Sequence, residues 1–88
     1  MAYLHIGQNV MLEEKRIIGI FDLDNTTVQK ASRDYLAKAE KSGIVENVCL
    51  DLPKSFVVTE TAGQRKVYIT QISSTTLLKR TNMFDYLK

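Results

Sequence analysis

The residue types most suited to chemistry lie within Ile17–Thr27, where an apolar run is followed by Asp22-Leu23-Asp24-Asn25-Thr26. An apolar strand that ends in Asp-x-Asp-x-Thr is the nucleophile motif of one class of phosphohydrolase. In such an enzyme Asp22 would attack phosphorus and Asp24 would protonate the leaving group, while Mg²⁺ and a cation held the phosphate. This segment therefore raises the hypothesis of a magnesium-dependent phosphohydrolase.

The rest of the chain argues against that hypothesis. The acids that follow Asp24 are scattered singly, so no second acidic pair completes a metal site: Asp34, Glu40, Glu46, Asp51, Glu60 and Asp85. The fold of these phosphatases is a doubly wound parallel sheet, and its five or so βαβ units take roughly 30 residues each. This sequence has 88 residues. Asp22 and Asp24 are explained equally well as acids at a helix N-terminus, where negative charge is favourable.

The other reactive side chains are few. His5 alternates with apolar neighbours in an expected strand, and no partner residues accompany it to form a metal site. Cys49 is the single cysteine and lies between apolar residues, which favours strand packing and excludes an internal disulfide. The sequence also lacks a Gly-rich phosphate loop and a plausible catalytic triad. We therefore expect no enzyme activity, no metal and no cofactor.

The basic residues leave two interpretations open. They occur in small groups: Lys15-Arg16, Lys30 with Arg33, Lys38 with Lys41, Arg65-Lys66 and Lys79-Arg80. The formal net charge is only +2, so these groups can be an ordinary solvated surface. They can equally contact a phosphate backbone. Two or three cations would bind nucleic acid weakly, but a symmetric assembly would repeat them and collect a large, salt-sensitive affinity.

Several short runs predict strands. The expected strands are Tyr3–Ile6, Val10–Leu12, Ile17–Phe21, Ile44–Leu50, Phe56–Thr59 and Lys66–Ile72. Ile17–Phe21 lacks clean alternation, so we expect that strand to be buried on both faces. Thr61-Ala62-Gly63-Gln64 separates the last two runs and predicts a hairpin.

Two helices are expected. Residues 28–42 form an amphipathic helix that Thr26 or Thr27 caps and Gly43 ends; its apolar positions are Val28, Ala31, Tyr35, Leu36 and Ala39. Residues 74–80 form a short second helix, capped by Ser73 or Ser74. Strands, one helix, more strands and a short helix together predict an α+β fold with a small, largely antiparallel sheet.

Length and composition limit the number of domains and the kind of protein that the chain can be. Residues 1–88 are expected to form one domain, and a chain this small buries only about 60–65 % of its unfolded surface, so self-association would be a natural source of further burial. No run approaches the roughly 20 apolar residues of a membrane span, and no signal peptide is visible. We expect a cytoplasmic protein. The apolar tail within residues 81–88 is expected to dock on the core or on another subunit, or to fray.

Several blocks of the sequence resemble the extracellular matrix regulatory protein family, which comprises RemA and RemB, and the similarity is greatest to the RemB branch. The blocks are Tyr3–Val10, Arg16–Thr27, Leu52–Thr59 and Lys66–Arg80. The resemblance implies a bacterial regulator of biofilm matrix genes that assembles into rings or dimers. In the RemA branch such rings bind double-stranded DNA upstream of matrix operons. In this family the Asp22–Thr26 segment is a passage from strand to helix.

The resemblance also implies site residues. Arg16 falls where the RemA branch carries an arginine implicated in DNA binding, and Lys15 and Lys54 are the basic residues expected to act with it. Leu52 and Pro53 stand where that branch has an arginine pair. The expected function is therefore a DNA-binding transcriptional regulator that holds phosphates without much base readout. The alternative is a self-assembling interaction module that does not touch DNA and acts on a paralogous regulator.

Overall fold

The computed structural model describes residues 3–23, 29–49 and 51–81. Their elements follow one another in the order β1 (Tyr3–Gly7), β2 (Val10–Glu13), the 3₁₀ turn η1 (Glu14–Arg16), β3 (Ile17–Asp22), α1 (Gln29–Lys41), β4 (Val45–Asn47), β5 (Ser55–Thr61), β6 (Gln64–Thr70) and α2 (Ser74–Arg80). The protein has an α+β fold, as the sequence predicts. The strand expected over Ile44–Leu50 is shorter than predicted, and Leu50 lies outside the described residues.

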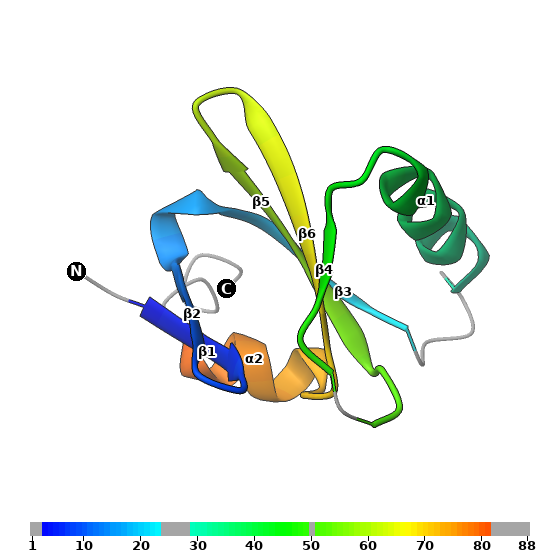
Figure 1. Cartoon of the computed structure of the whole chain (residues 1–88). Coiled ribbons are helices and arrows are strands. Elements are labelled where there is room, and N and C mark those ends of the chain that lie inside the picture. The colour runs from blue at the N-terminus through cyan, green and yellow to red at the C-terminus, as the bar shows by residue number, and fades with distance from the viewer. Residues whose placement is uncertain (1–2, 24–28, 50, 82–88) are drawn as a thin grey trace.

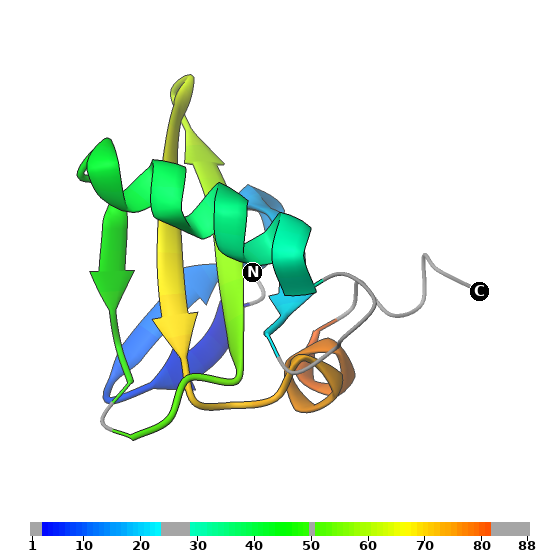
Figure 2. The same ribbon diagram turned by 90° about the vertical axis from the view of Figure 1, so that its right-hand side faces the viewer.

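The main sheet has the strand order β3-β5-β6-β4. β3, β5 and β6 are antiparallel neighbours, whereas β4 runs parallel to β6 because α1 carries the chain across the sheet. α1 lies on one face of the sheet, and the β1–β2 hairpin lies on the other face together with α2 (Figures 1 and 2). The sheet is therefore the middle of three layers.

The core consists of two apolar clusters, one on each face of the sheet. Alternate residues of β5 point to opposite faces, so Phe56 and Val58 belong to the cluster beneath α1 and Val57 belongs to the other. The second cluster joins the sheet to the hairpin and to α2, chiefly through Ile6 and Leu77, which are fully buried. Each such side chain contributes on the order of 1.5–3 kcal/mol by leaving water.

The structure confirms the predicted C-terminal end of α1 and the predicted N-terminal cap of α2. Gly43 has φ +74°, and the backbone N–H of Gly43 and Ile44 donate to the last turn of α1. Ser73 caps α2 by accepting a hydrogen bond from the N–H of Thr76 at 3.3 Å. Thr26, Thr27 and Val28 lie outside the described residues.

The buried stripe of α1 differs from the predicted one. Ser32 and Ala39 are buried, whereas Ala31 is exposed. The stripe therefore includes a serine that apolar periodicity alone would leave out.

Both antiparallel hairpins turn through residues of positive φ. Gln8 and Asn9 connect β1 to β2 with φ values of 42° and 67°, and Ala62 and Gly63 connect β5 to β6 with 52° and 79°. Two consecutive residues of positive φ give the twist that paired strands require. The hairpin predicted at Thr61–Gln64 is confirmed.

The prediction that Ile17–Phe21 is buried on both faces is wrong. β3 is the edge strand of the main sheet, and the side chains of Ile18 and Phe21 are 51 % and 42 % exposed. A bulge after Ile17 turns both side chains toward the α1 side of the sheet. The strand that is buried on both faces is β5, where Ser55 through Thr59 are all buried. The missing alternation in Ile17–Phe21 therefore reflects a bulge in an edge strand, and not burial on both faces.

The phosphohydrolase hypothesis fails on architecture. Asp22 is the last residue of β3, and β3 pairs antiparallel to its neighbour, whereas the phosphatase fold requires its nucleophile strand inside a parallel sheet. Asp24 and Thr26 lie outside the described residues.

Candidate functional site

Arg16 closes the turn between the β1–β2 hairpin and the main sheet, and two contacts hold its guanidinium. Nη1 donates a hydrogen bond to Thr61 Oγ1 at 2.8 Å, at the end of β5. Nε lies 3.0 Å from Glu13 Oε1, an ion-pair distance at which the N–H is not aligned for a hydrogen bond. The side chain is 39 % exposed, so it reaches the surface in a set orientation.

Lys15 lies beside Arg16 and shares the same carboxylate. Its Nζ is 3.5 Å from Glu13 Oε2, and its side chain is 66 % exposed. Each oxygen of Glu13 therefore faces one cation. Exposed pairs of this kind contribute between about zero and 1 kcal/mol, so the pairing leaves both cations open to a stronger anion.

The structure does not bring Lys54 to the same place. The backbone of Lys54 is anchored, since its N–H donates to Thr70 O at 3.0 Å and its carbonyl accepts from Leu23 N–H at 2.9 Å, but its side chain is exposed. Lys54 precedes β5, whereas Thr61 ends it. A strand of this length separates its ends by roughly 20 Å. Within one subunit, Lys54 and Arg16 therefore lie at opposite ends of β5.

The sequence alone did not identify Glu13 and Thr61 as the residues that contact Arg16. The spacing of Glu13 and Arg16, three residues apart, is a signal that could have identified the first of these contacts. Thr61 is 45 positions away along the chain and carries no local signal.

Two other basic residues, Arg65 and Lys66, have acidic partners. The hydroxyl of Tyr35 and then Glu60 raise the pKa of Arg65, and Glu60 Oε1 lies 3.4 Å from its Nε. A hydrogen bond with Glu46 at 2.9 Å raises the pKa of Lys66. Both cations therefore make contacts with acidic residues of the same chain, and both side chains remain about half exposed.

His5 and Cys49 take structural positions. His5 is exposed on β1, and its carbonyl accepts a hydrogen bond from Arg80 Nη1 at 3.2 Å. The half-buried Cys49 thiol donates to the carbonyl of Asp51 at 2.6 Å.

Over residues 3–23, 29–49 and 51–81, no three His, Cys, Asp or Glu side chains gather where they could hold a metal ion. Neither of the two described helices has the length and apolarity of a membrane span.

Comparison with known proteins shows one curated relative. No family model matches the chain. The chain is 33 % identical over 84 residues to extracellular matrix regulatory protein B of Bacillus subtilis (strain 168), and the alignment covers 94 % of this chain and 95 % of that protein. The relative is a regulatory protein by its name. Because the identity extends over nearly the whole of both chains, this protein belongs to the extracellular matrix regulatory protein B family.

Proposed function

We propose that this protein is a DNA-binding transcriptional regulator of extracellular matrix genes that acts in the cytoplasm as a symmetric homo-oligomer. The observation that carries the proposal is Arg16, which Thr61 and Glu13 hold at the surface with Lys15 beside it. A guanidinium has five N–H donors, and these two contacts leave donors for a phosphate oxygen. A held arginine also loses less side-chain entropy on binding than a free one.

The proposed contact is electrostatic and depends on repetition. One Lys15–Arg16 pair neutralises at most two phosphates, which supports only weak binding. Copies related by symmetry would present the pair repeatedly along one duplex and raise the affinity through effective concentration. DNA must compete with Glu13 for both cations, so the affinity of each copy stays modest.

Replacement of Arg16 by alanine tests the proposal. We expect Arg16→Ala to bind duplex DNA more weakly and to reduce the slope of log affinity against log salt by about 1 for each phosphate contact that is lost. A mobility-shift titration over a salt series measures both quantities. Lys38→Ala is the matched control, because Lys38 is an exposed cation on α1, and it should bind as the wild type does. Wild-type affinity and slope in Arg16→Ala would show that Arg16 has no such role.

A second function is favoured by Leu52. This side chain is 76 % exposed, more than any other large hydrophobic among the described residues, and it stands where the RemA branch carries one arginine of a pair. An exposed apolar side chain in a loop suits a protein partner better than a phosphate. The second candidate is therefore a self-assembling interaction module that acts on a paralogous regulator. Closed oligomers by light scattering, together with no binding to duplex at low salt, would favour this candidate over the first.

A further inference from the structure

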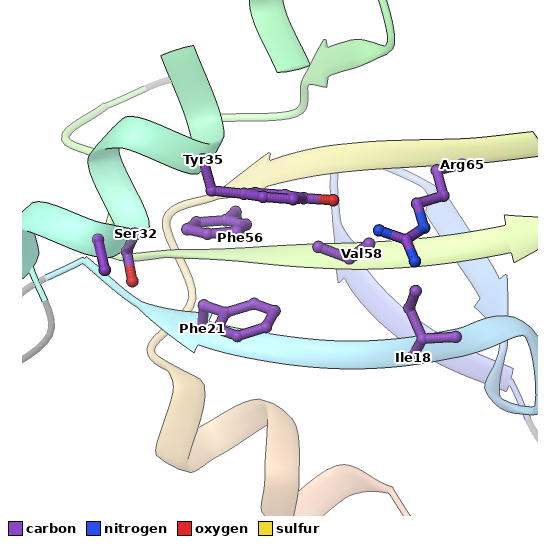
Figure 3. A pocket seen from close by; sticks show the side chains of 8 residues that line it. Ile18, Phe21, Ser32, Tyr35, Phe56, Val58 and Arg65 are labelled. Carbon is purple, nitrogen blue, oxygen red and sulfur yellow. The ribbon is translucent and has the colours of Figure 1, made fainter. Parts of the chain in front are cut away.

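A groove lies between α1 and the outer half of the main sheet (Figure 3). Its volume is about 410 Å³, within the range of small-molecule sites. Its lining is apolar except at its two ends, where Ser32 and Arg65 lie; the full set is Ile18, Phe21, Ala31, Ser32, Tyr35, Phe56, Val58 and Arg65.

Three stacked aromatic rings form one wall of the groove. Phe21 and Phe56 stack with centroids 5.0 Å apart, and Tyr35 stacks on Phe56 at 6.1 Å. The buried Phe56 holds the other two rings in place. Gly19 makes the arrangement possible, since a Cβ at this position would lie 2.5 Å from Cε2 of Phe21. The wall is therefore set by packing within the subunit.

A single cation stands at one end of this apolar wall. Figure 3 shows the guanidinium of Arg65 beside Val58 and Ile18, with the hydroxyl of Tyr35 directed toward it. Glu60 approaches Nε at 3.4 Å, and the Tyr35 hydroxyl is a further partner of the guanidinium, which carries more N–H donors than these two contacts use. The terminal nitrogens can bind a carboxylate through two parallel hydrogen bonds.

We propose that the groove binds a small amphipathic anion, with its apolar chain or ring on the exposed side chains of Ile18 and Phe21 and on the half-buried Tyr35, and its carboxylate on Arg65. Charge complementarity is the reason for choosing this class of ligand. The apolar lining of the groove disfavours a polyanion, whereas Arg65 at its end favours a ligand with one anionic group. The groove lies on the opposite face of the sheet from Arg16, since alternate residues of β5 separate the two: Val58 lines the groove, and Thr59 lies beside Arg16. The site is thus independent of the proposed DNA contact.

Amide NMR titrations with octanoate and with octanol test the proposal. Octanoate should shift amides of β3 and α1 around the groove and should saturate below its aggregation concentration. Arg65→Gln should weaken octanoate binding about fivefold and leave octanol binding unchanged. Lys66→Gln is the matched control, because Lys66 is the next residue along β6 and packs over Tyr68, away from the groove. It should change neither affinity.

A second variant tests the location. Ala31 is exposed on α1 and lines the groove, so Ala31→Leu fills the site without disturbing the helix and should weaken both ligands. The proposal is overturned if octanoate shifts no groove amides saturably, or if Arg65→Gln weakens octanol as much as octanoate. It is also overturned if octanoate binding falls as protein concentration rises, because a second copy of the chain would then cover the groove.

Discussion

At the scale of single residues, the main finding is that contacts within the chain hold Arg16 in place. Glu13 lies within ion-pair distance of both Arg16 and Lys15, and Thr61 accepts a hydrogen bond that orients the Arg16 guanidinium. The same carboxylate that positions the arginine also competes with any incoming phosphate. A charged ligand must therefore offer more than one contact to displace it.

Leu52 provides a gain-of-function test at this scale. Because its side chain is 76 % exposed, Leu52→Arg adds a cation at no packing cost. If the protein binds DNA through the surface that includes Lys54, this variant should bind duplex more tightly and steepen the salt slope by about 1 per added phosphate contact. A salt-series titration measures the effect.

Leu52→Gln is the control for the lost leucine, and its DNA affinity should match that of the wild type. Equal affinities and equal slopes for Leu52→Arg and Leu52→Gln would place the loop at residues 51–54 outside any DNA contact.

At the scale of elements, β4 is the least anchored strand of the main sheet. It has three residues, pairs only with β6, and does so in the parallel sense. The ion pair between Lys66 of β6 and Glu46 of β4 reinforces this pairing at 2.9 Å.

This pair predicts a pH dependence. The hydrogen bond with Glu46 raises the pKa of Lys66 above its ordinary value of 10.5 in the folded state. The stabilisation is therefore fully present below that ordinary value and is lost as pH rises through the folded pKa. Glu46→Gln should lower the free energy of unfolding by about 0.5 kcal/mol near neutral pH, since both side chains are half exposed. The difference from wild type should vanish at high pH.

Urea unfolding at a series of pH values measures this difference. Glu40→Gln, an exposed acid on α1, is the control and should show no such convergence. A Glu46→Gln deficit that persists unchanged above the folded pKa of Lys66 would mean that the charge pair is not its cause.

At the scale of the whole molecule, one buried hydroxyl links two layers. Thr70 Oγ1 on β6 donates to the carbonyl of Ile6 on β1 at 2.6 Å, and it accepts from the N–H of Ile72 at 3.1 Å. Thr70 and Ile6 are fully buried, so the carbonyl of Ile6 cannot turn to water instead, whereas Ile72 is half-buried.

Thr70→Val should therefore destabilise the protein although it keeps the side-chain shape. The variant leaves the buried carbonyl of Ile6 and the N–H of the half-buried Ile72 without this partner, at a cost of about 1–3 kcal/mol in the free energy of unfolding. Chemical denaturation measures the change. Thr75→Val on the exposed face of α2 makes the same chemical change without burial. Similar losses in the two variants would show that the Thr70 hydrogen bonds do not contribute to stability.

The amino-acid sequence determined the features that depend on near neighbours along the chain. Both helices, the Ser73 cap, the Gly43 stop and the Ala62–Gly63 turn were predicted, because backbone conformation and capping are decided within a few residues. The family was also predicted from sequence blocks. Arg16 was identified as a candidate through the family resemblance, and Lys15 as a basic neighbour that would act with it.

Only the tertiary structure decided which residues meet. The Ile17–Phe21 run could not reveal that it forms a sheet edge, because burial depends on the strands placed beside it and not on its own hydrophobicity. The contact of Arg16 with Thr61, the distance of Lys54 from it and the groove beside Arg65 likewise arise from pairings across the sheet. Sequence periodicity specifies local conformation, whereas contacts between distant residues exist only once the layers have packed.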